Sequence, residues 1–561
     1  MNLEVPELIK SIHLEYIIAG AELIETNTFS ANLYKIPDEE KCYKVNIEGA
    51  KIAKEVAKNK LIVAGSVGPI GKLLYPFSEI RKEDVKKYFY PQIKGLVDGN
   101  VDLIAVETQI LIEEAEEIIK VIKEIRKDMP ILLSFSFNED RMTPFGVSVK
   151  DVVELAEKYK VEFVGANCGV GPLSFVEIID EFLSLTKIPV SSMPNAGLPT
   201  YKKGGFFYSS HPEHFSNYAL KMVQQGVKII GGCCGTEPRY ISNIKQKMSE
   251  FIDIKKKNRV FIKEKKEKKK EVLEEKNLFR DKIRNKEFIF SLEVYPPKGI
   301  LNEKIFENLK NLKEKGIDFV NVVDLPLAKM RMSGIAFAHI IKEKIGFEPI
   351  LHFTCRDRNI LSIYADLLGA RALGIKNILA LTGDPPIMGD YPHATATYDL
   401  TKIGLLRLIK YLNEGKDISG REIEINFDFF AGTSISFSEI EEEDKIKEKI
   451  EFGAKFFFTQ PIYETYFIKK FKEKFDFPIF AGILICKDMK MLEYFAKEVP
   501  DIEIPEKILI SFEKFQEDFL KFQEDFLIDL IKDLKEVANG VYLISPGVKK
   551  EIIERIIKEV K

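Results

Sequence analysis

Short apolar runs alternate with amphipathic segments along the whole chain. The apolar runs are rich in Val, Ile and Phe, as buried strands are, and the segments between them repeat apolar residues at helical spacing. This alternation predicts parallel sheets built from strand–helix–strand units. In the first half the runs lie at residues 22–26, 61–67, 102–108, 131–137, 162–168, 189–194 and 227–233. In the second half they lie at 288–295, 319–324, 349–354, 377–382, 425–431, 455–460, 478–483 and 541–544.

The number of runs predicts how each sheet is arranged. Eight parallel strands with helices between them close into a barrel whose active residues lie at the carboxyl ends of the strands, and the second half supplies eight runs. The first half supplies seven, and its segment 6–20 has the spacing of a helix that should follow a strand. The sequence therefore predicts an α/β protein with two TIM-type (β/α)8 barrels in tandem, the first lacking its opening strand. Either a strand precedes residue 1 in the full polypeptide, or the first barrel is open on one side.

A highly charged segment separates the two halves. The 561 residues are too many for one ordinary core and suit two barrels. Residues 255–270 are mostly Lys and Glu, which cannot be buried together. We predict a first domain at 1–254, a charged linker at 255–284 and a second domain at 285–561. Binding of a polyanion by the lysines is the alternative to a solvated spacer.

Composition narrows the classes of partner. A net charge of -3 argues against general affinity for nucleic acid. No apolar run is long enough to span a bilayer, and the start of the chain lacks the features of a signal peptide, so we expect a cytoplasmic protein without a membrane partner. Six cysteines do not make a disulfide framework in a chain of this size, and a reducing compartment leaves them free for metal. The oligomeric state stays open, a homo-oligomer included.

Three cysteines follow apolar runs in the first half. Cys233 and Cys234 end one run between glycines, and Cys168 ends another. Three thiolates at strand ends can occupy three corners of a zinc tetrahedron and leave the fourth for a substrate. The alternative is that they are small core residues, as free cysteines commonly are. Adjacent residues in a strand point to opposite faces, so Cys233 and Cys234 can share one ion only where the strand has ended.

The sequence around these cysteines resembles the homocysteine S-methyltransferase family from about residue 2 to residue 254. Besides Asn167-Cys168-Gly169, the matching stretches are 24–29 (IETNTF), 65–69 (GSVGP), 106–108 (VET), 194–199 (PNAGLP) and 231–236 (GGCCGT). The resemblance implies an opening strand with an Asp-Gly-Ala-Met-Gly-Thr type of segment that lines the substrate site, and this sequence begins after it.

The same resemblance implies roles for single residues. Cys168, Cys233 and Cys234 would bind zinc, and homocysteine would take the remaining position on the metal. Glu107 would meet the amino group of homocysteine, and Asn27 stands at a strand end that faces the same mouth. Without the motifs, Glu107 and Asn27 are equally consistent with helix caps.

From residue 285 onward the chain resembles methylenetetrahydrofolate reductase over nearly its full length. The matching stretches are 290–297 (FSLEVYPP), 351–358 (LHFTCRDR), 379–386 (LALTGDPP) and 458–463 (FTQPIY), all at the ends of predicted strands. The resemblance implies FAD at the barrel mouth, NAD(P)H as reductant and a tetrahydrofolate derivative as substrate. The cofactor would carry the hydride, and the protein would supply position, electrostatics and a proton.

Opening the folate ring needs an acid, and the matching motif offers the Glu293 carboxyl with apolar neighbours that would raise its pKa. The resemblance places Asp384 between flavin and folate and gives Gln460 a folate contact. The residues that it assigns to FAD are His352, Thr354, Gly383, Asp384 and Lys449. Without the motifs, His352 would be read as a core histidine and Asp384 as a turn residue.

These features together favour a bifunctional enzyme of one-carbon metabolism. Its reductase half would make 5-methyltetrahydrofolate, and its zinc half would pass a methyl group to homocysteine to form methionine. The alternative is an active reductase joined to a truncated, non-catalytic methyltransferase domain.

Overall fold

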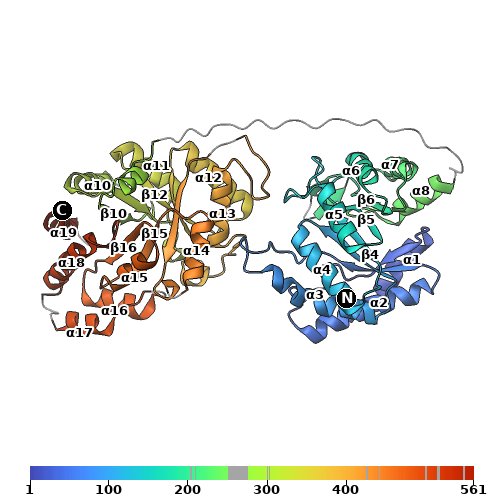
Figure 1. The fold of residues 1–561 in the computed structure, drawn as a ribbon, viewed down its shortest axis with the longest axis horizontal. Coiled ribbons are helices and arrows are strands. Elements are labelled where there is room, and N and C mark those ends of the chain that lie inside the picture. Colours follow the sequence, from blue (N-terminus) through green and yellow to red (C-terminus); the bar gives the residue numbers. More distant parts are fainter. Residues whose placement is uncertain are drawn as a thin grey trace. The chain divides into compact units, whose positions relative to one another are not determined.

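The structure is a computed structural model of the chain, which describes residues 1–561 apart from 203–204, 209, 250–275, 300, 302, 425–426, 441, 500–501, 515–517 and 548–549. The chain forms two compact units, made mainly of residues 1–268 and 269–561 (Figure 1). The lysine-rich segment 255–270 lies outside the described residues, as does the rest of the expected linker up to residue 275. Among the described helices, none is long and apolar enough to cross a lipid bilayer.

The first unit is built on seven parallel strands in the order β1-β2-β3-β4-β5-β6-β9. All seven predicted runs contain a strand, so the tandem-barrel prediction is confirmed for this half, including the missing opening strand. The strands are β1 (Leu23–Glu25), β2 (Ile62–Val67), β3 (Leu103–Gln109), β4 (Ile131–Phe135), β5 (Phe163–Asn167), β6 (Val190–Met193) and β9 (Ile229–Ile230). The sheet curls but does not close, because β1 and β9 are its two edges.

Eight helices surround this sheet, and each contacts the next around the ring, α8 contacting α1. They are α1 (Pro6–Ile18), α2 (Glu39–Ala57), α3 (Val85–Asp98), α4 (Ile112–Ile125), α5 (Val149–Tyr159), α6 (Pro172–Leu185), α7 (Pro212–Gln225) and α8 (Pro238–Ser249). Local signals explain their starts: Asp38 caps α2, and Ser148 with Asp151 forms a capping box on α5. The main core of the unit lies between helices and sheet.

An antiparallel hairpin, β7 (Pro199–Lys202) with β8 (Gly205–Tyr208), interrupts the alternation after β6. The apolar pattern did not predict this hairpin, because its only apolar run, Phe206-Phe207-Tyr208, is shorter than the run of a buried strand. The hairpin contributes Tyr208, whose hydroxyl hydrogen-bonds to Cys234.

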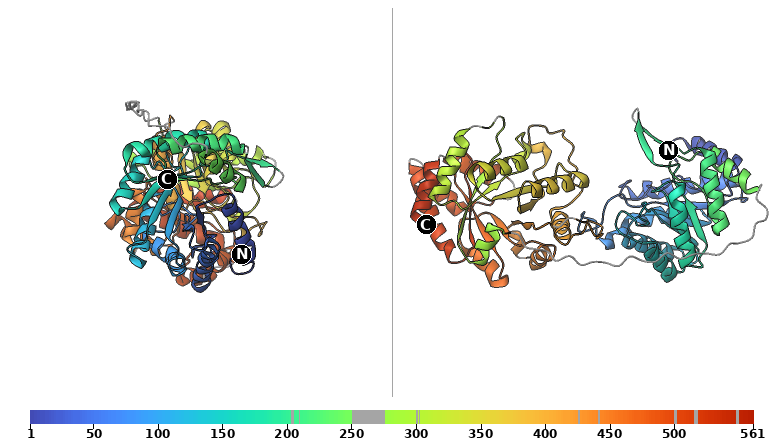
Figure 2. Two further views of the ribbon diagram at one scale, coloured as in Figure 1. Left: turned by 90° about the vertical axis from the view of Figure 1, so that its right-hand side faces the viewer. Right: turned by 90° about the horizontal axis from the view of Figure 1, so that it is seen from above.

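The second unit is a closed barrel of eight parallel strands. Two further views show its strands enclosed by helices (Figure 2). The strands are β10 (Ile289–Val294), β11 (Phe319–Val322), β12 (Pro349–Thr354), β13 (Asn377–Leu381), β14 (Phe430–Ile435), β15 (Phe457–Pro461), β16 (Ile479–Leu484) and β17 (Gly540–Ile544). The helices are α9 (Leu278–Arg284), α10 (Glu303–Lys315), α11 (Gly334–Ile345), α12 (Ile360–Ala372), α13 (Lys402–Asn413), α14 (Glu443–Glu451), α15 (Tyr466–Lys474), α16 (Met489–Glu498), α17 (Glu506–Glu513), α18 (Phe519–Lys535) and α19 (Lys550–Val560).

One predicted strand is shifted. Strand β14 begins at Phe430, near the end of the run expected at 425–431, of which residues 425–426 lie outside the described residues. Before that point the backbone of Phe429 is bonded on both its N–H and its carbonyl to the side chain of Asn413, at the end of α13. The Phe427 and Phe429 rings stack on each other at 5.3 Å. An apolar run therefore precedes the strand without joining the sheet.

Helix α9 closes the amino end of the second barrel. Its Phe279 is fully buried and packs against four rings, those of Phe319, Phe430 and Phe480 on three strands and that of Phe456 just before β15. A residue close in the sequence to the charged segment thus contributes to the barrel core.

Candidate functional site

Three cysteine thiols meet at the carboxyl ends of the strands in the first unit. The Sγ atoms of Cys168, Cys233 and Cys234 all lie within 4.8 Å of one another, and those of Cys168 and Cys234 are 3.8 Å apart. Thiolates bound at 2.3 Å to a tetrahedral zinc would themselves be about 3.8 Å apart. Because β9 ends at Ile230, Cys233 and Cys234 lie beyond the strand and escape its alternation. The donor set and spacing fit a single zinc ion.

The backbone around Cys168 is shaped to present its thiol. Cys168 has a left-handed φ of 62°, and its N–H donates to the carbonyl of Met193 on the neighbouring strand. Gly169 follows with φ of 74°, and a Cβ there would lie 2.1 Å from the carbonyl oxygen of Phe137. Only glycine fits that position, so the glycine of the Asn-Cys-Gly motif is a geometric requirement.

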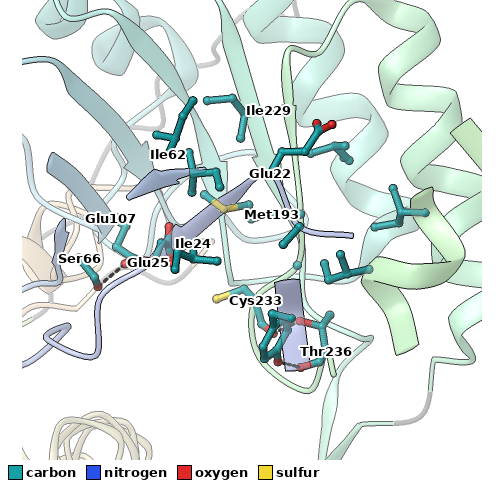
Figure 3. Close-up of a pocket in the computed structure, with 18 of the residues that line it drawn as sticks. Glu22, Ile24, Glu25, Ile62, Ser66, Glu107, Met193, Ile229, Cys233 and Thr236 are labelled. Carbon is teal, nitrogen blue, oxygen red and sulfur yellow. Dashed lines mark hydrogen bonds between the residues drawn. The ribbon is translucent and has the colours of Figure 1, made fainter. Parts of the chain in front are cut away.

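A buried carboxyl lies beside the thiols. Glu107, 6% exposed on β3, accepts a hydrogen bond of 2.5 Å from the Ser66 hydroxyl (Figure 3). Its other oxygen lies 3.4 Å from the amide nitrogen of Asn167, which is also 3.8 Å from the Cys233 sulfur. Asn167 is held in turn by the N–H of Thr108. A chain of hydrogen bonds therefore links the carboxyl to the cysteine cluster.

The electrostatics of this site follow from burial and from shared protons. Hydrogen bonds from Cys168 and Cys233 lower the pKa of the Cys234 thiol. Burial raises the pKa of Glu107 well above its usual value, and the nearby Glu25 carboxylate adds to the increase. Burial likewise raises the pKa of Glu25 to about 7. Two carboxyls that resist ionisation would gain from a cation bound between them.

The end of β1 and the residues after it place Glu25 and Asn27 at the same cavity. Glu25 was not singled out by sequence reasoning, although it stands in the IETNTF stretch at the end of β1. It lines the same cavity as Glu107 and the cysteines, a space of about 1200 Å³. Asn27 also lines this cavity, but its side-chain amide donates to Asn2 at 2.9 Å. Glu25 is thus the residue of this stretch whose charge affects Glu107, because it raises the pKa of the Glu107 carboxyl.

In the second unit, Glu293 stands at the carboxyl end of β10 and accepts hydrogen bonds from two tyrosines. Tyr295 follows it in the chain, whereas Tyr542 comes from β17, the strand paired with β10. Burial raises the pKa of Glu293 to about 7, against the lowering effect of the bond from Tyr295. Tyr542 escaped sequence reasoning because its only signal was one tyrosine in an apolar strand.

Gly383 and Asp384 follow β13 in a tightly packed turn. Gly383 has φ of 92°, and a Cβ there would lie 3.0 Å from the Cβ atoms of Arg356 and Thr354. The Asp384 carboxylate accepts the N–H of Leu327 at 2.6 Å, and its backbone carbonyl accepts from Arg356 at 2.8 Å. Leu327 itself has a left-handed φ of 54°, a conformation that costs energy in a residue with a branched side chain. The turn is therefore fixed by two hydrogen bonds, one from Leu327 and one from Arg356.

His352 and Thr354 lie on β12, one strand away from that turn. His352 is 6% exposed, and its Nε2 finds no partner among the described residues. Burial lowers its pKa to about 4, so the imidazole is neutral near pH 7. The Thr354 hydroxyl donates to Asp324 at 2.8 Å. A buried, unpaired and neutral imidazole at a barrel mouth fits a polar group of a bound cofactor.

Lys449 and Gln460 complete the predicted set. Lys449 on α14 is 1% exposed and donates to Glu439 at 2.6 Å and to the carbonyl of Ser434, at the end of β14, at 3.1 Å. Burial lowers its pKa to about 8. Gln460 is half-buried near the end of β15. The strand ends thus bring Glu293, His352 and Thr354 to one mouth, and Lys449 is fixed by Glu439 and by the carbonyl of Ser434.

The chain is a tandem-barrel protein with a site on each barrel, and each barrel is a parallel β-sheet surrounded by helices. The first barrel is open and has three thiols at its mouth. The second is closed and has a buried carboxyl at its mouth. Residues 278–558 match the sequence model of the family described as methylenetetrahydrofolate reductase, and residues 2–248 match that of homocysteine S-methyltransferase. The chain belongs to the methylenetetrahydrofolate reductase family, and the expected homocysteine S-methyltransferase domain precedes the reductase domain.

Curated relatives match the first half. The methionine synthase of Mycobacterium leprae is 29% identical over 253 residues, which are 43% of this chain and 21% of that protein. Homocysteine S-methyltransferase 1 of Arabidopsis thaliana is 28% identical over 274 residues, covering 43% of this chain and 83% of that protein. The chain thus spans about a fifth of the length of the methionine synthase.

Among solved structures, the metallated homocysteine methyltransferase MmuM from Escherichia coli is similar to this chain. Its sequence is 24% identical, the TM-score is 0.39, and the match covers 44% of this chain and 86% of that one.

Proposed function

We propose that the chain is a bifunctional enzyme of folate-dependent one-carbon metabolism. Its second unit would reduce 5,10-methylenetetrahydrofolate to 5-methyltetrahydrofolate with FAD and NAD(P)H. Its first unit would transfer a methyl group to homocysteine with zinc, forming methionine. The observation that carries the methyl-transfer activity is the convergence of three thiols within 4.8 Å of one another.

In the first unit, Cys168, Cys233 and Cys234 would hold the zinc. When bound, zinc keeps a thiol ligand deprotonated near neutral pH, so that the sulfur remains a nucleophile. Glu107, kept in place by Ser66 and Asn167, would bind the ammonium group of homocysteine. That cation would offset the unfavourable burial of the carboxylates of Glu107 and Glu25, which supports an amino acid as the substrate.

In the second unit, His352, Thr354, Gly383, Asp384 and Lys449 would hold FAD, and the unpaired Nε2 of His352 supports this assignment. When bound, FAD carries the hydride from the nicotinamide to the folate. Glu293 would protonate the departing ring nitrogen, because its raised pKa keeps part of it protonated near pH 7. Asp384 and Gln460 would bind the folate, the first with a carboxylate that the Leu327 N–H fixes in place.

A second candidate is a chain that works only as a reductase. The open edge of the first unit favours this alternative, because a site at the mouth of an open barrel is supported by fewer neighbouring strands. The two candidates differ in the fate of homocysteine, which only the bifunctional enzyme consumes.

The test is an anaerobic assay with FAD, NADH and methylenetetrahydrofolate, with and without homocysteine. We expect methyltetrahydrofolate in both reactions, and methionine only where homocysteine is added. Methyltetrahydrofolate without methionine, in protein that carries one zinc per chain, would leave the reductase-only candidate. Absence of both products in protein that retains FAD would contradict the whole proposal.

A further inference from the structure

Four neighbouring strands of the second barrel turn polar side chains into its interior. The core inside this barrel includes one residue from each of the strands β10, β11, β12 and β17, namely Ile289, Phe319, Ile350 and Tyr542. Side chains alternate between the two faces along a strand, so residues two or four positions further on also face the interior. Glu293, Asn321 and His352 are at such positions, and together with Tyr542 they form a polar sector of the barrel interior.

Asn321 lies beside Glu293, the residue proposed above as the acid. The two residues are partners in the parallel pairing of β10 with β11, and paired residues point to the same face of a sheet. Asn321 is 0% exposed, and neither Oδ1 nor Nδ2 of its side chain has a hydrogen-bond partner among the described residues. The sequence did not indicate this residue, because one asparagine in the apolar run 319–323 (FVNVV) gives no separate signal.

An asparagine at this place lowers the stability of the barrel. Barrel interiors are filled mainly by branched apolar side chains, and leucine has the branched shape of asparagine. A buried amide without partners loses the hydrogen bonds that water gives it in the unfolded chain, whereas an apolar side chain has none to lose. Natural sequences break such a local rule mainly at functional sites. The unpaired amide of Asn321 therefore indicates a role in the site.

Glu293 is the partner that can still accept hydrogen bonds. Its two carboxyl oxygens each accept one, from Tyr295 and from Tyr542. An ionised carboxylate has about four acceptor positions, so positions remain for an amide N–H. The other residue paired with Asn321 is Ile350 on β12, whose side chain is apolar. Glu293 is therefore the polar one of the two residues paired with Asn321.

A carboxamide suits both charge states of a carboxyl group. Its NH2 group donates to the carboxylate, and its carbonyl oxygen accepts the O–H of the protonated acid. A lysine at this position would keep the neighbouring carboxyl ionised, and a second carboxylate would keep it protonated. An asparagine is thus suited to a carboxyl that loses and regains a proton during turnover.

The other titratable or charged groups of this region do not share this property. The His352 ring lies 6.1 Å from the ring of Tyr542, and burial lowers the pKa of His352 to about 4. Burial raises the pKa of Tyr295 well above its usual value. The Arg331 guanidinium lies over the Tyr295 ring, 5.2 Å from its centroid. Glu293 is the group here whose pKa is about 7.

We propose that Asn321 is a positioning residue for Glu293: its amide hydrogen-bonds to the Glu293 carboxyl and stabilises the carboxylate once the proton has left. This role rests on the proposed function, in which Glu293 protonates the departing ring nitrogen. In that step the nitrogen takes the proton, the electron pair of the O–H bond stays on the carboxylate, and solvent later returns a proton. Asn321 itself does not touch the substrate.

The test compares the whole chain with its Asn321→Leu variant, which keeps the branched shape and removes the amide. Ser291→Ala is the matched control, because Ser291 faces the same interior and its hydroxyl donates to the carbonyl of Val541 at 3.3 Å. Infrared titration of FAD-free protein follows the Glu293 carboxyl band, with Glu293→Gln as the blank. Urea unfolding of the same proteins measures stability. The pH profile of methylenetetrahydrofolate reduction is recorded on FAD-loaded protein.

We expect Asn321→Leu to raise the midpoint of the Glu293 titration by about one pH unit or more, because a hydrogen bond to a charged group is lost. The descending limb of the activity profile should move to higher pH as well. The kcat should fall about tenfold with unchanged KM, since the carboxylate that forms in the reaction is less stabilised. The urea midpoint should stay the same or rise. Ser291→Ala should leave the titration unchanged.

An unchanged titration midpoint in Asn321→Leu would overturn the proposal, whether or not that variant is less stable. Should the leucine variant not fold, Asn321→Ala allows the same comparison, because it adds no volume to the interior. Full folate reduction by Glu293→Gln would overturn the proposed acid and, with it, this role of Asn321. Lost reduction in Glu293→Gln together with an unchanged titration in Asn321→Leu would overturn the role of Asn321 alone.

Discussion

At the scale of single residues, both sites depend on groups whose ionisation the fold has changed. Cys168, Cys233 and Cys234 share protons at one mouth, and Glu293 is buried between two tyrosines at the other. The sequence predicted these four residues because they stand in motifs at strand ends. It did not predict Glu25 and Tyr542, because their partners Glu107 and Glu293 lie on other strands, and only the folded sheet brings them together.

The acid role of Glu293 predicts how reduction depends on pH. An acid is active while protonated, so turnover should be highest below about pH 7 and fall as the pH rises through that value. Glu293→Gln should lose most folate reduction at every pH. Steady-state rates of methylenetetrahydrofolate reduction between pH 5.5 and 9 measure both effects.

Tyr295→Phe is the companion variant for this profile. The Tyr295 hydrogen bond lowers the pKa of Glu293, so its removal should move the descending limb to higher pH. A limb that stays at the same pH in Tyr295→Phe, with activity retained, would assign the titration to another group.

The cysteine cluster predicts metal content. Cys168→Ser and Cys234→Ser should each lower zinc from about one per chain to a small fraction, since three protein ligands are the minimum of a typical catalytic zinc site. Cys42→Ala is the control, because Cys42 is buried in the same unit and its thiol donates to the carbonyl of Ala31. Metal analysis of the purified proteins measures the zinc content per chain. Equal zinc in all four proteins would refute the three-thiol site.

At the scale of elements, the turn after β13 shows how backbone geometry limits the sequence. Gly383→Ala should destabilise the second unit by about 1–3 kcal/mol, because φ of 92° strains a residue that carries a Cβ and the contacts of that Cβ at 3.0 Å are tight. Gly369→Ala, on α12, is the matched control. A Cβ at Gly369 meets nothing within 4 Å, so alanine there should stabilise by about 0.5–1 kcal/mol. Urea unfolding measures both, and equal effects would contradict the strain at Gly383.

The structure also differs from the sequence-based expectation in some of its elements. Alternating apolar runs predicted the fifteen strands of the two parallel sheets, and all but one of these lie where expected, whereas the hairpin strands β7 and β8 were not predicted. In the run at 425–431, the described residues 427–429 do not form a strand, and the Asn413 side chain takes both backbone hydrogen bonds of Phe429. Helix α9 was not predicted, because it lies next to the charged segment in the sequence. Its Phe279 nevertheless packs among four other phenylalanines of the barrel core.

At the scale of the whole molecule, the two sites belong to separate compact units. Removal of zinc by a chelator should therefore abolish methyl transfer to homocysteine and leave folate reduction within about twofold, because metal binding stabilises only the unit that holds it. Parallel assays of methionine and methyltetrahydrofolate after chelation, with zinc added back as the control, measure this. Loss of both activities that zinc restores together would show that the units are coupled.

The sequence by itself determined the alternation of strands and helices, the count of parallel strands in each half and the residues that stand at their carboxyl ends. These are local properties, because side-chain periodicity and short motifs repeat within a single element. Only the tertiary structure decided which strand ends meet, that Glu25 faces Glu107, that Tyr542 reaches Glu293, and that one sheet closes while the other leaves a place between β9 and β1. Those outcomes depend on contacts between residues far apart in the chain, and no local pattern encodes them.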